Sequence, residues 1–234
     1  MRNSKRLLIA LLALIMAMPT MAQFETHRKR SRYNHNDTER YYGARLGLNI
    51  ASMSSEYAGY DMDSRSGLAF GGVIGWQLAN QTPLWLETGL FYSEKGGKTH
   101  WTEPTEDGPS INEKVTVRLS YFEVPIVVKY SFDTGVDDLY VQPFLGGYLA
   151  LGIGGKTKEY GEYNANTHQY RGRSSYSSFD NFNRFDGGLR IGCGAEYKMV
   201  YGELGFDFGL ANVSKGDFDT THTRNFFINV GVNF

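Results

Sequence analysis

The sequence predicts an all-β protein: an eight-stranded, antiparallel, closed transmembrane β-barrel with a side-chain-filled lumen. Apolar residues alternate with polar residues and glycine in eight segments, the connections alternate between short and long, and the chain ends on an aromatic residue, Phe234. Successive side chains of a strand point to opposite faces, so each segment has one apolar face. In a membrane that face lies against lipid, and only a closed ring satisfies the backbone there.

Each alternating segment is long enough to cross a bilayer as a tilted strand, which takes about 9–11 residues. In chain order the segments cover residues 41–52, 67–78, 84–95, 117–132, 139–153, 185–197, 200–211 and 226–234. Their predicted outer faces include, in the same order, Leu48, Phe70, Leu90, Ile126, Leu145, Ile191, Leu204 and Ile228. The inner faces are rich in glycine and include Arg45, Gly75, Glu87, Lys129, Gln142, Arg190, Glu203 and Asn229.

The connections alternate in length, as they do in outer-membrane barrels. The short ones are residues 80–83, 133–138 and 198–199, and the long ones are residues 54–66, 96–116, 154–184 and 212–223. Both termini then lie on the side of the short turns. We therefore expect the protein in the cell outer membrane, with periplasmic termini and extracellular long loops.

The N-terminal residues predict a secretory signal peptide, residues 1–22. Three basic residues precede an apolar run of about a dozen residues, which is shorter than the ~20 residues of a membrane helix, and Ala22 is the expected cleavage site. Gln23 follows in place of the cysteine of a lipoprotein. Residues 23–40 then form a basic, flexible periplasmic arm because they are too polar to build a core, and residues 41–234 form the barrel domain.

The amino-acid composition excludes further classes of protein. The chain carries 24 Lys and Arg against 25 Asp and Glu, so no global basic charge points to nucleic acid. Its single cysteine, Cys193, cannot form an internal disulfide. The mean hydropathy of -0.39 excludes a helical membrane protein. It is compatible with a barrel, in which only alternate residues are apolar.

The final segment predicts how the barrel is assembled. Its end resembles the signal read by the barrel-assembly machinery, formed here by Phe226, Ile228, Val230, Val232 and Phe234. A soluble lipocalin-like barrel, with its apolar face inward, is the alternative. The glycine-rich polar face opposes it, and so do aromatic residues near strand ends, which resemble interfacial girdles. These are Tyr41, Tyr42, Trp76, Tyr92, Tyr130, Tyr140, Tyr197 and Phe234.

Five sequence motifs within the predicted strands carry a family resemblance. They are GARLGLN at residues 43–49, LETGLFYSEKG at 86–96, YFEVP with VVKY between 121 and 130, FDGG at 185–188 and GLAN at 209–212. Together they resemble the outer-membrane β-barrel family of Bacteroidota that includes the PorT-like proteins, over residues 41–234. The resemblance implies the barrel fold and an outer-membrane location. Some members of that family assist a protein secretion system, and many have no assigned role.

The inner face of the predicted barrel collects charges of both signs. They are Arg45, Glu87, Lys95, Glu123, Lys129, Asp186, Arg190, Glu196, Glu203 and Asp207. The interior of an eight-stranded barrel is just wide enough for side chains to fill, so these charges must pair or keep water. We expect a structural plug of ion pairs and no open solute pore. A narrow ion path or proton relay is the alternative.

The longest predicted loop, residues 154–184, has the composition of a recognition loop, with Tyr, Ser, Gly, Asn and Arg. Its candidate interaction residues are Tyr160, Tyr163, Tyr170, Arg171, Arg173 and Tyr176. We expect a protein that acts through interactions at the membrane, in secretion or cell-surface attachment. Besides outer-membrane lipid, its candidate partner is a protein or a glycan. The alternatives are a narrow porin-like channel, a purely structural barrel and a loop without a partner.

Histidines in the predicted loops raise the alternative of an outer-membrane hydrolase. His100, His168 and His222 lie there, and Asp217 and Asp219 are near His222, so a catalytic dyad or a weak metal site is conceivable. No spacing matches a known ligand motif. We therefore predict no catalytic residue, no metal site and no cofactor.

Overall fold

The computed structural model describes a barrel. It describes residues 39–55, 62–78, 82–103, 111–160, 163–164, 169–170, 173–215 and 220–234, with side chains except at 101–103, 111–113 and 161–173. The predicted signal peptide and nearly all of the predicted arm lie outside these residues. Within the described ranges, no helix is both long and apolar enough to cross a membrane.

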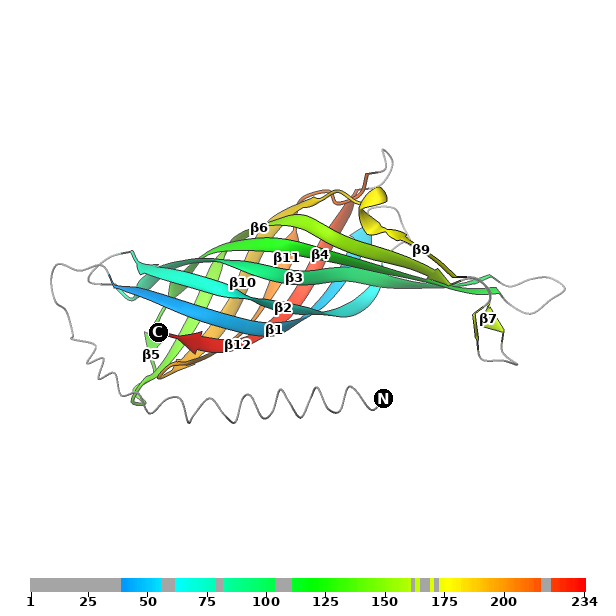
Figure 1. The fold of residues 1–234 in the computed structure, drawn as a ribbon. Helices are drawn as coiled ribbons and strands as arrows, with labels where there is room; N and C mark the ends of the chain where they lie inside the picture. Colours follow the sequence, from blue (N-terminus) through cyan, green and yellow to red (C-terminus); the bar gives the residue numbers. More distant parts are fainter. Residues whose placement is uncertain are drawn as a thin grey trace. The chain divides into compact units, whose positions relative to one another are not determined.

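Eight long antiparallel strands form the wall (Figure 1). They are β1 (Arg40–Ser55), β2 (Met62–Gln77), β3 (Leu84–Glu103), β4 (Ile111–Tyr130), β6 (Leu139–Tyr160), β10 (Phe185–Tyr197), β11 (Val200–Gly209) and β12 (Thr221–Asn233). Each pairs with the next in this order, and β12 pairs with β1 from Gly43↔Asn233 to Ser55↔Thr221. The ring is therefore closed, which confirms the predicted fold class.

Four short strands and one 3-10 helix complete the described structure: β5 (Phe132–Asp133), β7 (Tyr163–Asn164), β8 (Gln169–Tyr170), β9 (Arg173–Ser177) and η1 (Ser178–Asp180). β5 pairs with the start of β6, β9 pairs with its end, and β7 pairs with β8. We call the end of the barrel that holds β5 and Phe234 the turn end, and the opposite end, which holds β9 and η1, the loop end (Figure 1).

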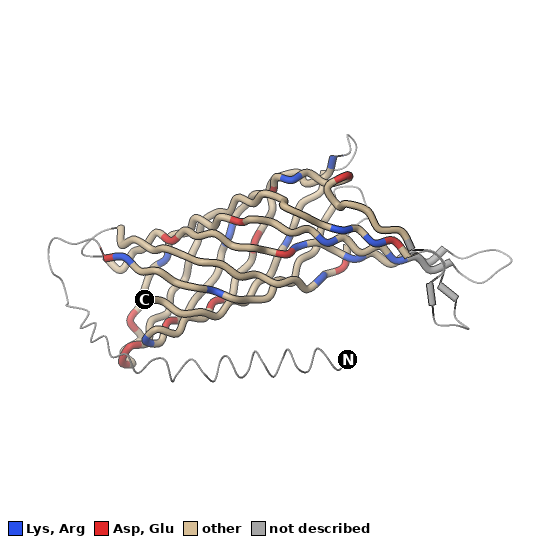
Figure 2. The backbone as a smooth tube through the Cα atoms, viewed as in Figure 1, with Lys and Arg blue, Asp and Glu red and all other residues tan. Residues whose placement is uncertain are grey.

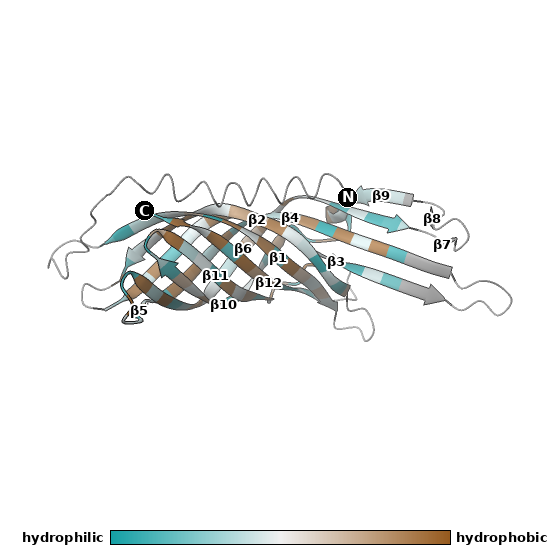
Figure 3. Cartoon of the chain, turned by 90° about the horizontal axis from the view of Figure 1, so that it is seen from below, coloured by the Kyte–Doolittle hydropathy of each residue, from teal (hydrophilic) through white to brown (hydrophobic). Residues whose placement is uncertain are grey.

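The wall has an apolar outside and a polar inside over most of its length. Leu48 and Leu145 on the outer face are 56% and 60% exposed, whereas their sequence neighbours Asn49 and Phe144 are buried. Figure 3 shows the apolar residues on the strands of the wall, with more hydrophilic residues on β3 and β4 toward the loop end. The period-two pattern of the sequence thus becomes two faces, as predicted.

The main difference from the prediction is at the loop end, where strands replace predicted loops. β3 and β4 continue as a paired hairpin from Gly96↔Arg118 to Glu103↔Ile111, in the predicted loop 96–116. β6 runs to Tyr160 and pairs with β9, in the predicted loop 154–184. β3 and β4 keep the register that they have in the wall, whereas the pairing of β4 with β6 shifts by one residue between Ser120 and Tyr121. We call this extension of β3, β4, β6 and β9 the loop-end sheet.

A hydrophobic cap closes the interior below the loop-end sheet. It contains Met53, Val117, Leu119, Tyr121, Tyr148, Ala150, Phe179 and Val213, with Met62, Val115 and Phe182 packed against them. Phe179 comes from η1 and lies over Gly152, where a β-carbon would be 2.2 Å from the ring. Glycine at this position therefore makes room for the aromatic ring.

Candidate functional site

All ten predicted lumen charges lie inside the barrel. Nine of these residues are buried, and the side chain of the tenth, Glu203, is 7% exposed. They come from five of the eight wall strands, β1, β3, β4, β10 and β11, and alternate residues of each strand point inward. The structure divides most of them between two neighbouring clusters of ion pairs.

The first cluster lies below the hydrophobic cap and is centred on Arg190 and Lys95. Arg190 Nη2 lies 2.5 Å from Glu123 Oε1, and Arg190 Nε lies 2.6 Å from Asp207 Oδ1. Lys95 Nζ lies 2.8 Å from Glu123 Oε2 and 3.7 Å from Asp186 Oδ2. Two cations thus pair with three carboxylates, and the five residues come from four strands, β3, β4, β10 and β11, so this cluster ties opposite sides of the wall together.

The second cluster lies toward the turn end and is centred on Lys129. Its Nζ is 2.7 Å from Glu87 Oε1 and 3.7 Å from Glu203 Oε2. Arg45 Nη2 is 3.6 Å from Glu87 and donates a hydrogen bond to Asn233 Oδ1 at 2.7 Å. Every predicted cation of the lumen therefore has a carboxylate within 4.0 Å.

Neutral side chains complete both clusters, and of these only Gln142 and Asn229 were named above as inward residues. Tyr201 accepts a hydrogen bond from Lys129 and donates one to Glu203, and its ring lies 4.0 Å from the Arg45 guanidinium. The ring of Tyr148 lies 3.9 Å from Lys95 Nζ. Further hydrogen bonds come from Asn49, Gln142, Thr223, Asn225 and Asn229. All occupy inward positions of the alternation, which is the signal that could have identified them.

One predicted girdle residue is placed differently. Tyr41 points into the lumen, where its hydroxyl donates a hydrogen bond of 2.5 Å to Glu87 Oε2. Its neighbour Tyr42 is 53% exposed on the outer face. The prediction was wrong for Tyr41 because a terminal position alone does not decide the face; the alternation does.

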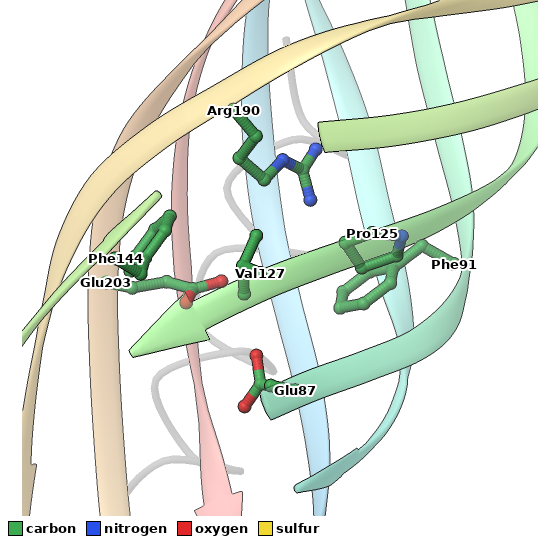
Figure 4. A pocket seen from close by; sticks show the side chains of 7 residues that line it. All are labelled: Glu87, Phe91, Pro125, Val127, Phe144, Arg190 and Glu203. Carbon is green, nitrogen blue, oxygen red and sulfur yellow. The ribbon is translucent and has the colours of Figure 1, made fainter. Parts of the chain in front are cut away.

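The space left between the charges is small. A cavity of about 10 Å³ is lined by Glu87, Phe91, Pro125, Val127, Phe144, Arg190 and Glu203 (Figure 4). A water molecule needs roughly 10–15 Å³ by this measure. At this level the lumen therefore has room for about one water molecule, and the hydrophobic cap covers it from the loop end.

Of the six candidate interaction residues, the structure describes the side chains of two, Tyr160 and Tyr176. Tyr176 Oη donates a hydrogen bond of 2.6 Å to Glu159 Oε1, and burial together with this carboxylate raises the pKa of Tyr176 to about 12. Tyr160 pairs through its backbone with Arg173, and Tyr163 pairs with Tyr170. Arg171 lies outside the described residues, and the side chains of Tyr163, Tyr170 and Arg173 are not described.

The two described histidines contact an aspartate and a backbone carbonyl group, respectively. His100 Nδ1 lies 3.7 Å from Asp63, and its side chain is 52% exposed. His222 Nδ1 lies 3.2 Å from the Ala211 carbonyl oxygen. His168, Asp217 and Asp219 lie outside the described residues. In the part of the chain that the structure covers, no group of three potential ligands could hold a metal ion.

The predicted assembly signal forms the outer face of β12, between β1 and β11. Its members Ile228, Val230 and Phe234 are 47%, 50% and 54% exposed. The Phe234 amide donates a hydrogen bond to the Tyr42 carbonyl oxygen at 2.8 Å. These residues therefore close the ring and face outward at the turn end.

Comparison with known proteins gives one family. The model of the outer membrane protein β-barrel domain matches residues 21–215. No protein of curated function matches the sequence. Among solved structures, Ail, the attachment invasion locus protein of Yersinia pestis, has 14% identity and a TM-score of 0.38, with 84% of this chain and 99% of that chain covered. Neisserial surface protein A has 17% identity and a TM-score of 0.40, with 85% and 98% covered.

Proposed function

Because the chain belongs to the outer membrane protein β-barrel domain family, we propose that it is a non-conducting, non-enzymatic outer-membrane protein that acts through its loop end. In this proposal the turn end and both termini face the periplasm, and the loop-end sheet faces the outside. The signal peptide, residues 1–22, is removed after Ala22, and residues 23–40 remain as a periplasmic arm.

A single observation supports the proposal: ion pairs and the hydrophobic cap fill the interior, while the strands of the wall extend past the cap at the loop end. The ion-pair clusters occupy the lumen, and the hydrophobic cap covers them. A barrel filled in this way has no aqueous path for a solute. The loop-end sheet, in contrast, adds paired strands that the lumen does not need, and it offers a rigid surface to a partner.

We propose a protein or glycan at the cell surface as the partner of the loop-end sheet and of residues 161–172. The best test removes those residues without opening the cap. Because Tyr160 and Arg173 are directly paired, replacing residues 161–172 by Asn-Gly should close a two-residue hairpin turn. β9 and η1, which supplies Phe179 to the cap, remain in place.

The measurement is photo-crosslinking in cells from a reactive residue at Ser175, followed by mass spectrometry. The Asn-Gly variant should lose the crosslinked partner while keeping normal levels of folded barrel. Crosslinks that persist unchanged in the variant would contradict the proposal. Large, stable conductance of the purified protein in planar bilayers would favour the channel alternative.

The resemblance to PorT-like proteins supports a second candidate, an accessory role in protein secretion. There the basic arm, residues 23–40, would contact an acidic periplasmic partner. Replacing the basic residues of the arm by glutamine should then reduce secretion while leaving surface crosslinks intact. The reverse outcome would favour surface attachment.

A further inference from the structure

A row of basic side chains lies on the outer face of the loop-end sheet. In antiparallel strands, directly opposite residues share a face. Arg118 is opposite Lys156, and Thr116 is opposite both Lys98 and Lys158. We call the cations of this face, with their neighbour Lys114 on β4, the basic belt: Lys98, Lys114, Arg118, Lys156 and Lys158. Figure 2 shows Lys and Arg gathered on these strands.

The basic belt continues the lipid-facing surface of the wall. On β4 the same outer face carries Phe122 and Ile126, which are 48% and 47% exposed, and then Tyr130 near the turn end. On β6, Leu151 is opposite Phe122 and is 58% exposed. A molecule lying along this face therefore meets an apolar surface first and cations next.

The distance along β4 places the belt at the edge of a bilayer. Twelve residues separate Arg118 from Tyr130. With a rise of about 3.3 Å per residue and a strand tilt of about 40°, this is roughly 30 Å along the membrane normal. The apolar band of an outer-membrane barrel is about 25 Å tall. If Tyr130 marks one edge of the band, Arg118 lies about 5 Å beyond the other edge, at the level of the lipid headgroups.

The cations of the belt exceed the anions beside them. Glu94 contacts Arg118 and lies 3.9 Å from Arg65, and Asp63 is opposite Lys98. The residues opposite Lys156 and Lys158 are Arg118, Thr116, Ser175 and Ser177, none of which is acidic. Neither lysine forms an ion pair with a described residue. The side chain of Arg118 remains 48% exposed despite its contact with Glu94.

We propose that the basic belt binds the phosphate groups of glycolipid headgroups in the outer leaflet of the membrane. The occupant follows from charge and position, because a phosphorylated headgroup is the anion that lies above acyl chains at this height. Arg118 and the two lysines of β6 supply charge-assisted hydrogen bonds to phosphate oxygens. The inference rests on the proposed orientation, with the loop end outward.

The test uses the purified mature protein in neutral detergent micelles. Its probes are diphosphoryl lipid A, the same lipid without phosphates, and inorganic pyrophosphate. Binding is measured by thermophoresis at two salt concentrations. The variant is Lys156→Gln/Lys158→Gln. The matched control, Arg40→Gln/Lys198→Gln, removes two exposed cations from the turn end. Heat-modifiable mobility on gels verifies that each barrel is folded.

The wild type should bind diphosphoryl lipid A at least tenfold more tightly than the dephosphorylated lipid, and salt should weaken this binding. The β6 variant should lose roughly tenfold, since each cation near a charged lipid surface contributes a severalfold factor, and the control should bind like the wild type. Equal binding of the two lipids, or an equal loss in the control, would overturn the inference. Pyrophosphate that binds as tightly as the lipid would also overturn it, because the site would then take a free anion.

The result of the lipid-binding test does not depend on the result of the crosslinking test of the proposed function. Lipid binding in micelles needs neither a protein partner nor residues 161–172, so the Asn-Gly variant should bind diphosphoryl lipid A like the wild type. Loss of surface crosslinks with unchanged lipid binding would leave the inference standing. If the Asn-Gly variant keeps its crosslinks while the Lys156→Gln/Lys158→Gln variant loses its preference for phosphorylated lipid, the proposed function fails and the lipid-binding inference stands.

Discussion

The two halves of strand β4 have opposite arrangements of polar and apolar side chains. Toward the turn end, Ile126 and Val128 lie on the outer face, and Glu123 and Lys129 point inward. Toward the loop end the faces are exchanged. Lys114, Thr116 and Arg118 lie outside, and Val115, Val117 and Leu119 lie inside. The strand itself remains regular through this exchange.

The comparison shows that the medium outside the wall, lipid or water, determines whether polar or apolar side chains fill the interior. In the half next to lipid, the outer face must be apolar, so the inner face holds the polar groups and pairs them. In the half beyond the lipid, the outer face meets water, and the inner face forms an ordinary hydrophobic core. The exchange occurs at Ser120 and Tyr121, where β6 also has a register shift. We therefore expect the membrane boundary at this level of the wall.

The largest expected effect comes from the ion pairs of the lipid half. Arg190→Met leaves Glu123 and Asp207 without their guanidinium partner, so the free energy of unfolding should fall by about 3–5 kcal/mol. Urea unfolding in detergent micelles measures it. Arg224→Met, at an exposed position of β12, is the matched control and should change stability by less than about 0.5 kcal/mol. Equal effects would mean that the lumen charges do not act as pairs.

The membrane boundary can be tested with one substitution on either side. Ile126 and Thr116 lie on the same face of β4. Ile126→Arg places a charge about 10 Å from Tyr130, near the bilayer midplane, and should cost about 2–4 kcal/mol. Thr116→Arg lies beyond the boundary, where it meets repulsion from the opposite Lys98 and Lys158 but no lipid, and should cost less than about 1 kcal/mol. Reversible unfolding from lipid vesicles measures both, and similar costs would place the boundary elsewhere.

A substitution in the hydrophobic cap should cause a smaller loss of stability. Phe179→Leu keeps an apolar side chain over Gly152 and should cost about 1 kcal/mol. Hydrogen exchange should become faster in β9 and η1 and stay unchanged in β10 and β11. Phe208→Leu, on the outer face and 46% exposed, should leave exchange in β9 unchanged. Ion conductance that appears in the Phe179→Leu variant would mean that the cap, and not the ion pairs, closes the lumen.

The smallest effect concerns a tyrosine of the loop half. The raised pKa of Tyr176, about 12, means that folding favours its neutral form. Its contribution to stability is therefore complete below the ordinary pKa of about 10 and is lost as the pH rises through 12. The difference in absorbance at 295 nm between wild type and Tyr176→Phe should titrate near pH 12. After unfolding in urea it should titrate near pH 10, and equal midpoints would contradict the contact with Glu159.

The sequence predicts the lipid half well because apolar and polar residues alternate regularly along each of its strands. Alternation identified the wall strands and the face of residues such as Leu48 and Glu87, since lipid demands an apolar outer face at every second position. It also placed all ten charged residues in the lumen, although it could not pair them. Lys95 on β3 meets Asp186 on β10 and Asp207 on β11 across the lumen. Such pairs depend on how the closed ring staggers its strands.

The strands of the loop half were not predicted because the apolar residues there lie on the inner face and no longer on the outer face. In β4 the apolar positions change from even to odd numbers at Ser120, so a search for one continuous face stops. In β3 the pattern is also interrupted by Gly96, whose φ of +140° suits glycine alone. β9 carries three serines and little apolar signal. Pairing with β6, which the sequence of β9 alone does not reveal, makes it a strand.

The pairing of lumen charges across the ring bears on the path by which the protein enters a membrane. A hairpin of β10 and β11 alone would present Asp186, Arg190 and Asp207 to lipid, with Glu123 and Lys95 still absent. Each exposed charge near the midplane costs up to about 4 kcal/mol. Hairpins therefore cannot insert one after another as independent units. The strands must curl and meet before, or while, the polypeptide crosses the hydrocarbon, so that insertion and ring closure form a single cooperative event.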